Sequence, residues 1–299
     1  MEKNYDVIIM GGSYAGLSAA MALGRSLRKV LIIDSGKPCN RQTPHSHNFI
    51  THDGKTPKEI SDLAKEQVLK YETIKFHDGI VMKTSKNPES FEIETKNGEK
   101  FYAKKIILAS GIKDVMPNIP GFAECWGISV IHCPYCHGYE VKGKITGIMA
   151  NGDLAFDFTK LVFNLTKDVT LFTNGKSTLN EEQLEKFNQN KIKLIEDEIN
   201  EIIHESGQIQ KVILKEGKEI LLEALYAKIP FEQNINVEDL GIELNEQGFI
   251  EIDMMQKTNI PGVFACGDNV TIMRSVANAV AQGNFTGAVV NKEFSEEEF

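Results

Sequence analysis

Hydrophobic and polar positions change period several times near the start of the chain. Residues 5–34, YDVIIMGGSYAGLSAAMALGRSLRKVLIID, contain the apolar run Val7–Met10, a glycine turn, a small-residue helical pattern and a second apolar run, Val30–Ile33. Short apolar runs bounded by turn residues are typical of buried strands, and a longer periodic segment is typical of a helix. The segment therefore predicts a strand–turn–helix–strand unit that ends at Asp34.

A second unit with the same pattern lies in the middle of the chain. The apolar runs Ile145–Met149 and Val169–Phe172 flank a helical pattern that begins near Asp153. Residues 191–229 then alternate as KIKLIEDEINEIIHE, IQKVILKEG and KEILLEALYAKI, which predicts the strands of a small sheet.

Two further segments end in glycine at a predicted strand terminus. Residues 91–111 predict a hairpin and a buried strand ending at Ala109-Ser110-Gly111, and residues 258–270, TNIPGVFACGDNV, predict a strand ending at Gly267-Asp268 before a small-residue helix. We expect an α/β fold with two Rossmann-like, three-layer ββα domains, the second inserted in the first. The predicted boundaries are 1–112 with 235–299, and 113–234, and the final SEEEF is expected to be a solvated tail.

Composition narrows the functional classes. A net charge of −9 argues against sequence-independent binding to nucleic acid or to anionic membranes, which requires a basic surface. Five cysteines in 299 residues do not make a disulfide framework, and no apolar stretch is long enough to span a membrane. The amino terminus shows no signal-peptide pattern, so a cytoplasmic location is expected.

The first unit carries the features of a dinucleotide-binding turn. Small residues after the first strand allow backbone N–H groups to approach a pyrophosphate at a helix N-terminus, and an acidic residue about 20 positions later suits a ribose hydroxyl. Asp34 has that spacing. In a G-x-G-x-x-G pattern read from Gly11, the middle glycine is Ser13, which weakens the motif taken alone.

Residues 132–140, HCPYCHGYE, admit three chemistries: covalent haem at C-x-x-C-H, half of a zinc site, or a reversible disulfide. The absence of an export pattern counts against haem. Zinc would need two more ligands, and the chain has no second C-x-x-C. Proline between the cysteines suits a helix start, where N–H groups stabilise a thiolate, so the disulfide is favoured.

Taken together, GGSYAGLSAA, Asp34, the ASG of 109–111, CPYC and TNIPGVFACGD resemble the low-molecular-weight thioredoxin reductases over nearly the whole length. The wording HCPYCHGYE, with the loop HSHNFITHDG, is similar to a branch that contains the gliotoxin- and holomycin-type dithiol oxidases. The resemblance implies FAD as cofactor and a homodimer. It also implies the following FAD-binding residues, with Asp34 on the adenosine ribose: Gly11, Gly12, Ser13, Ala15, Gly16, Asp34, Ser35, Arg41, Asn48, Val81, Ala109, Gly111, Gly267, Asp268, Ser275 and Val276.

The second nucleotide turn departs from the reductase pattern. Where an NADPH-binding turn would read G-x-G-x-x-A, residues 150–155 read ANGDLA, and the segment after the next strand reads FTNGKS without an arginine cluster. The only arginines are Arg25, Arg28, Arg41 and Arg274, so the predicted inserted domain has none. Lys176 offers a point charge but not a planar fork for a phosphate. Binding of NADPH or NADH is therefore doubtful.

By the same resemblance, Cys136 is the flavin-proximal sulfur and Cys133 is the outer sulfur that exchanges with substrate. His137 follows the pair, where the reductases carry an aspartate, and its ordinary pKa suits proton transfer near neutral pH. His132 either polarises Cys133 or has a structural role. Cys39, Cys125 and Cys266 are expected to be buried apolar residues. His45, His47 and His52 lie in a loop expected to shape substrate access, and no carboxylate cluster that would suggest a metal accompanies them.

The sequence thus predicts a flavin-dependent thiol–disulfide oxidoreductase that acts on a thioredoxin-like protein or a small dithiol or disulfide. A reductase would receive electrons from a nucleotide or from a protein donor such as ferredoxin. A dithiol oxidase would pass electrons from substrate to oxygen. A non-catalytic flavin-binding sensor is the alternative from another class.

Overall fold

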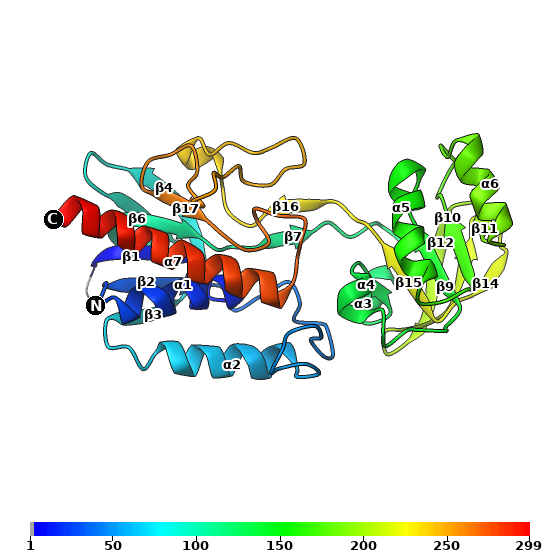
Figure 1. The fold of residues 1–299 in the computed structure, drawn as a ribbon, viewed down its shortest axis with the longest axis horizontal. Coiled ribbons are helices and arrows are strands. Elements are labelled where there is room, and N and C mark those ends of the chain that lie inside the picture. Colours follow the sequence, from blue (N-terminus) through cyan, green and yellow to red (C-terminus); the bar gives the residue numbers. More distant parts are fainter. Residues whose placement is uncertain (1–2) are drawn as a thin grey trace. The chain divides into compact units, whose positions relative to one another are not determined.

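The computed structural model describes residues 3–299 and divides the chain into two compact units (Figure 1). The outer unit consists of Met1–Arg41, Phe49–Lys113 and Phe231–Phe299. The inserted unit consists of Asp114–Pro230 together with Gln42–Asn48, a short segment that we call the strap. The strap therefore lies in the inserted unit although the predicted boundaries place it in the outer one.

The outer unit is built around one mixed sheet. Its elements in chain order are β1 (Asn4–Met10), α1 (Tyr14–Arg25), β2 (Val30–Asp34), α2 (Pro57–Val68), β3 (Ile74–Asp78), β4 (Val81–Lys86), β5 (Phe91–Thr95), β6 (Lys100–Leu108), β7 (Ile112–Asp114), β16 (Phe231–Gln233), the 3-10 helix η1 (Glu238–Leu240), β17 (Val263–Ala265) and α7 (Val276–Glu298). The sheet order is β3-β2-β1-β6-β5-β4, and β17 also pairs with β6. Strands β3, β2, β1, β6 and β17 are parallel, whereas β4 and β5 form an antiparallel extension of β6; β7 and β16 pair separately.

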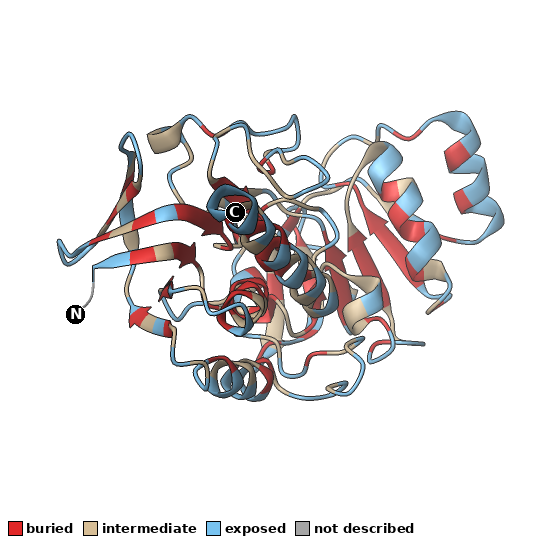
Figure 2. Cartoon of the chain, turned by 60° about the vertical axis from the view of Figure 1, so that its left-hand side comes forward, coloured by how far each residue is buried: buried red, intermediate tan, exposed pale blue. Residues whose placement is uncertain are grey.

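Alternation along β1 explains the three layers of the outer unit. Val7 and Ile9 face the helices α1 and α7, whereas Ile8 and Met10 face the opposite core, which β4, β5 and the segment around η1 cover. The central strands are therefore buried on both faces, as Figure 2 shows, and the helices expose only their outer sides.

The two helices on this sheet approach each other very closely. A Cβ added to Gly283 of α7 would lie 2.0 Å from the backbone oxygen of Ala15 in α1, and one added to Gly287 would lie 2.6 Å from the oxygen of Ala19. The small residues of both helices are thus needed for their packing. The packing also holds the beginning of α7 beside the beginning of α1.

The inserted unit repeats the layered arrangement. Its elements are α3 (Phe122–Cys125), β8 (Val130–Ile131), α4 (Pro134–His137), β9 (Thr146–Met149), α5 (Gly152–Phe163), β10 (Val169–Phe172), α6 (Glu181–Gln189), β11 (Lys193–Ile195), β12 (Ile199–Glu205), β13 (Gln208–Leu214), β14 (Glu219–Leu221) and β15 (Ala224–Ala227). A parallel sheet of order β11-β10-β9-β15-β8 has α5 and α6 on one core and the antiparallel sheet β12-β13-β14 on the other. Both units therefore have the α/β architecture that the sequence predicted.

The chain end differs from its prediction. Helix α7 continues to Glu298, and the Glu298 carboxylate pairs with Arg28 at 2.8 Å, so Ser295–Glu298 form the last turn of the helix, although SEEEF is exposed as expected. Other cations also hold this end of the helix: Lys105 of β6 contacts the carboxylates of Glu293 and Glu297, and Lys257 pairs with Glu293. Periodicity missed this because the anchoring partners are distant in sequence.

Candidate active site

The predicted cofactor residues of the outer unit meet at one edge of its sheet. Met10, the last residue of β1, is in register with Leu108 of β6 and Ile33 of β2, and Leu108 is in register with Ala265 of β17. The segments that begin after these strands therefore leave the sheet together. They contain Gly11–Ala15, Asp34–Ser35, Ala109–Gly111 and Gly267–Asp268.

The turn after β1 has room only for glycine. Gly11 has φ +110°, and a Cβ there would lie 2.2 Å from the backbone oxygen of Ala109. A Cβ at Gly16 would lie 1.8 Å from the oxygen of Gly11, and one at Gly12 would lie 2.9 Å from the Cβ of Asp34. Bare backbone at the start of a helix is the setting in which a protein holds a pyrophosphate.

The N-terminus of α1 has no side-chain cap. Ser13 occupies the N-cap position but accepts no hydrogen bond from the helix, so its hydroxyl does not cover the first N–H groups. Asp34 instead braces the turn, since its two carboxylate oxygens accept hydrogen bonds from the amides of Gly12 (2.8 Å) and Gly36 (2.9 Å). These residues fit the pyrophosphate and ribose of a dinucleotide such as FAD.

A charged group follows β17 on the same edge. The Asp268 carboxylate lies 3.7 Å from Nε of Arg274 and also 3.7 Å from Sγ of Cys39, and the Gly267 amide donates to the side chain of Gln282 in α7. Ser275 caps α7, since its hydroxyl accepts from the amide of Asn278 at 3.1 Å, and the helix begins at Val276. A Cβ added to Gly267 would lie 3.0 Å from the Cβ of Ala15, so the segment containing Asp268 begins beside the α1 turn.

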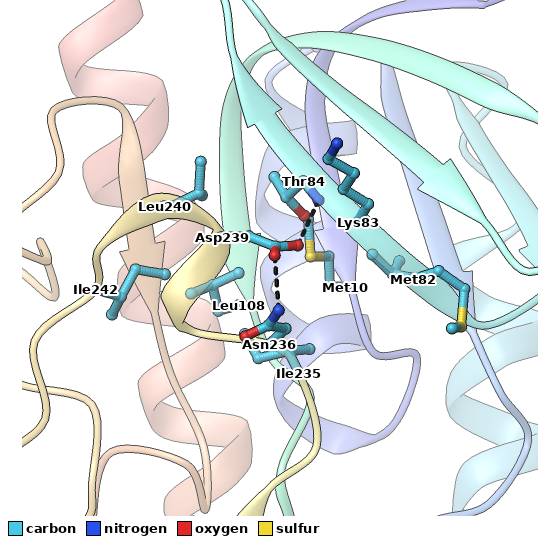
Figure 3. A pocket seen from close by; sticks show the side chains of 11 residues that line it. Met10, Met82, Lys83, Thr84, Leu108, Ile235, Asn236, Asp239, Leu240 and Ile242 are labelled. Carbon is cyan, nitrogen blue, oxygen red and sulfur yellow. Dashed lines mark hydrogen bonds between the residues drawn. The ribbon is translucent and has the colours of Figure 1, made fainter.

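Three other predicted cofactor residues are not part of these segments. Arg41 is exposed and donates to the backbone oxygen of Pro38. Val81, at the start of β4, lines a hollow of the outer unit whose empty volume of about 280 Å³ includes open solvent (Figure 3). Asn48 belongs to the strap and so to the inserted unit.

Figure 3 also shows what closes that hollow. The Asp239 carboxylate of η1 accepts hydrogen bonds from the backbone amide of Thr84 at 3.0 Å and from the side chain of Asn236 at 2.6 Å. These bonds fix η1 against β4. We therefore assign the hollow a structural role, as the packing boundary between these two elements.

The cysteine pair begins the one-turn helix α4 in the inserted unit. Cys133 and Cys136 are joined as a disulfide, Cys133 is the N-cap residue, and its sulfur accepts a hydrogen bond from the Cys136 amide at 3.1 Å. That amide would also stabilise a thiolate at Cys133. Gly138 completes the turn, because a Cβ there would lie 2.2 Å from the backbone oxygen of Pro134.

His137 is largely buried behind the pair. Neither of its ring nitrogens has a hydrogen-bond partner among residues 3–299. Burial lowers the pKa of the imidazole, the Glu140 carboxylate opposes that effect, and His47 adds to it. Glu140 had no predicted role although it lies within HCPYCHGYE, whereas His47 was predicted only as part of a loop that shapes substrate access.

The other histidines and cysteines have separate environments. His132 stacks on Trp126 with ring centroids 5.7 Å apart, which favours a structural role. Cys125 and Cys266 are buried, and burial raises their thiol pKa values to about 11 and about 12. Cys39 is only half-buried and contacts Asp268, so its prediction as a buried apolar residue was wrong. Within residues 3–299 no group of three or more His, Cys, Asp or Glu side chains could hold a metal ion.

The nucleotide turn of the inserted unit is arranged differently from that of the outer unit. The side-chain oxygen of Asn151, the N-cap of α5, accepts hydrogen bonds from the amides of Gly152 (2.8 Å) and Thr178 (2.9 Å). Its side-chain nitrogen donates to the backbone oxygen of Lys176. A Cβ at Gly152 would lie 2.9 Å from the Thr178 hydroxyl. The segment after β10 therefore lies across the start of α5.

Known proteins share this pair of Rossmann-like units. The family model described as pyridine nucleotide-disulphide oxidoreductase matches residues 5–283. The chain belongs to this family. It is 32% identical to thioredoxin reductase tcpT of Claviceps purpurea, over 96% of this chain and 94% of that protein.

Solved structures of the pyridine nucleotide-disulphide oxidoreductases agree with the fold. TrxB of Bacillus anthracis superposes with a TM-score of 0.94 at 31% identity, covering 99% of this chain and 100% of that one. HlmI superposes with a TM-score of 0.92 at 27% identity, covering 99% and 94% of the two chains. The chain is a thioredoxin reductase-like flavin oxidoreductase with a redox-active disulfide, and FAD is the cofactor expected of its family.

These findings settle two earlier alternatives. The disulfide and the family favour a redox pair over the haem and zinc interpretations of HCPYCHGYE. They also favour an enzyme over a non-catalytic flavin-binding sensor. No helix within residues 3–299 is long and apolar enough to cross a membrane.

Proposed function

We propose that the enzyme takes electrons from a dithiol substrate and releases that substrate as a disulfide, with oxygen as the final acceptor. The observation that carries this proposal is the hydrogen bonding of Asn151 at the start of α5. When a dithiol supplies the electrons, the reaction needs no nicotinamide nucleotide in the inserted unit.

Three features support the proposal that NADPH and NADH are not donors. Asn151 occupies the amide of Gly152, which a nucleotide phosphate would otherwise use. Thr178 and Lys176 are held over the same helix start. The inserted unit also lacks arginine altogether, so it has no planar fork for a 2′-phosphate.

In the proposed reaction the first substrate thiolate attacks Sγ of Cys133. The Cys133–Cys136 bond breaks, and its electron pair goes to Sγ of Cys136, which is released as a thiolate. The second substrate thiolate then attacks the first substrate sulfur and displaces Cys133, so the substrate leaves with one new S–S bond. His137 accepts the proton of an attacking thiol, since a neutral imidazole is a base near pH 7.

Bound FAD would take up the two electrons of the reduced pair and pass them to oxygen. We assign its pyrophosphate to the turn Gly11–Gly16 and its adenosine ribose to Asp34. Asp268, Ser275 and Val276 would hold the remaining part near the start of α7, where the helix dipole stabilises negative charge. The absence of a side-chain cap at Ser13 supports this assignment.

Anaerobic flavin bleaching tests the proposed function. One equivalent each of a small dithiol, NADPH and NADH is added separately to the oxidised enzyme, and visible flavin absorbance is followed before and after air is admitted. We expect rapid bleaching by the dithiol, reversal by air and no rapid bleaching by either nucleotide. Rapid bleaching by NADPH or NADH would overturn the proposal in favour of a reductase.

The same experiment separates a third case. If neither the dithiol nor a nucleotide bleaches the flavin, the oxidase direction is also wrong. A reduced ferredoxin is then the donor to add, because a protein donor needs no nucleotide site in the inserted unit.

A further inference from the structure

The strap Gln42–Asn48 is fixed to the redox-active side of the inserted unit. The Gln42 side chain donates to the backbone oxygens of Ala123 (3.1 Å) and Trp126 (3.4 Å). At the other end of the strap, Nε2 of His47 lies 3.6 Å from a carboxylate oxygen of Glu140. The strap therefore reaches the segment that follows the cysteine pair.

Two buried polar side chains on which Glu140 acts have no hydrogen-bond partner within residues 3–299. The Tyr226 hydroxyl is buried and makes no hydrogen bond with residues 3–299, and the same holds for both ring nitrogens of His137. Tyr226 is in register with Ile131, which ends β8 just before the redox motif. The Glu140 carboxylate acts electrostatically on both His137 and Tyr226.

We propose that Glu140 is a positioning residue for the redox pair: it anchors the strap through His47 and supplies the negative charge that lets buried His137 hold a proton. This inference deepens the proposed function and rests on it in one respect, namely that the Cys133–Cys136 pair exchanges with thiols.

The charged neighbours of His137 have opposite effects on it. Burial disfavours the imidazolium of His137, the Glu140 carboxylate favours it, and His47 disfavours it. On the redox turn itself Cys133 and Cys136 are joined as a disulfide and carry no titrating thiol, and β15 contributes the neutral hydroxyl of Tyr226. Glu140 is therefore the one favourable charge acting on His137 among these groups.

Without the Glu140 carboxylate, buried His137 would be a weaker base toward the substrate thiol. When a substrate thiol attacks Cys133, its proton must move to a group that can carry it, and His137 becomes an imidazolium at that moment. A carboxylate close to that imidazolium stabilises the charged form more strongly in a buried site than in water. Glu140 is partly exposed and pairs with His47, and it acts on His137 through its charge, since neither His137 ring nitrogen has a hydrogen-bond partner within residues 3–299.

The proposal predicts opposite effects for two substitutions. In Glu140→Gln the favourable charge is lost, so the titration midpoint of His137 should move to lower pH by about half a unit or more. In His47→Gln the unfavourable effect of His47 on the His137 imidazolium is lost, so the midpoint should move to higher pH by a few tenths of a unit. A merely structural role for the contact would shift both variants in the same direction or neither.

The measurement is NMR titration of the oxidised holoenzyme with isotope-labelled histidine, which gives seven ring signals. His137→Gln assigns the signal. Glu140→Asp keeps the charge and should remain close to the natural enzyme. Glu182→Gln removes a carboxylate that pairs with Lys186 on the surface helix α6 and should leave the His137 midpoint unchanged.

A second readout follows the reaction itself. The rate at which a dithiol reduces the Cys133–Cys136 bond is measured against pH in a single turnover, and the limb due to His137 should move with the NMR midpoint in each variant. An unchanged midpoint in Glu140→Gln would overturn the inference even if dithiols reduce the enzyme. Failure of dithiols to reduce the natural enzyme would instead overturn the proposed function and leave the NMR result to stand alone.

Discussion

The side-chain oxygen of Asn151 accepts a hydrogen bond from the backbone amide of Thr178, across the start of helix α5, at 2.9 Å. The corresponding residue of the outer unit, Ser13, makes no such bond. Both units have the same strand–turn–helix–strand plan, but they differ in the N-cap side chain of the helix at which a nucleotide phosphate would bind. One helix start keeps its amides available, and the other uses its N-cap side chain to hold a neighbouring segment.

Replacing Asn151 with Ala should release that segment. Loss of an N-cap typically costs about 1 kcal/mol, which is about a fivefold rise in local opening. We expect hydrogen exchange at the Gly152 and Thr178 amides to accelerate by about that factor, with flavin content unchanged. Asn180→Ala removes the cap of α6 and is the matched control, because it should loosen α6 while Thr178 stays protected. Equal protection of Thr178 in Asn151→Ala would show that the bond does not hold the segment.

Gly283→Ala tests the contact between α1 and α7. Alanine favours a helix over glycine by about 1 kcal/mol, yet its Cβ would meet the Ala15 backbone oxygen at 2.0 Å. We therefore expect net destabilisation of about 2 kcal/mol or more, with loss of flavin on purification, because the contact supports the cofactor turn. Asn284→Ala, at an exposed position of the same helix, is the control and should not lower the melting temperature. A melting temperature at or above that of the natural enzyme would refute the close contact.

The five thiols of the reduced protein should react in a fixed order. Burial raises the thiol pKa of Cys125 to about 11 and that of Cys266 to about 12, so neither forms appreciable thiolate at pH 8. Iodoacetamide followed by peptide mass spectrometry should modify Cys133 first and leave Cys125 and Cys266 intact until the chain is unfolded in guanidinium. Early labelling of Cys266 would contradict the burial that raises its pKa.

Stability should fall on mild acidification because of His137. Burial lowers the pKa of His137 in the folded protein below its ordinary value near 6.5, so the unfolded chain binds the proton more tightly. The associated stability is complete above the unfolded pKa and is lost as pH falls through the folded one. Each unit of pKa shift corresponds to about 1.4 kcal/mol.

His137→Asn removes that titration. Between about pH 7 and pH 5 the melting temperature of the oxidised natural enzyme should therefore fall more steeply than that of the variant. Parallel curves for the two proteins would show that burial of the imidazole is not coupled to unfolding.

The sequence predicts the two parallel sheets well, because strands buried on both faces appear as short apolar runs between glycine-containing turns. Val30–Ile33 and Val169–Phe172 are found in strands β2 and β10 almost to the residue. The cysteine pair was also predictable, since C-x-x-C with an internal proline specifies both a spacing and a helix start.

The features that the sequence did not give depend on contacts distant along the chain. Gln42–Asn48 belongs to the inserted unit because of bonds to residues about 80 positions away, which no local pattern reports. Glu140 stands within HCPYCHGYE, but only its ion pair with His47 reveals a role beyond that of an exposed acid. The extension of α7 to Glu298 likewise depends on Arg28.

The most direct test of the central claim is the anaerobic reaction of one equivalent of a dithiol with the natural enzyme and with Cys136→Ser. If electrons enter through the cysteine pair, the dithiol should bleach the flavin of the natural enzyme within seconds and leave that of Cys136→Ser oxidised. Bleaching of both proteins at the same rate would contradict the account, because the flavin would then receive electrons without the disulfide.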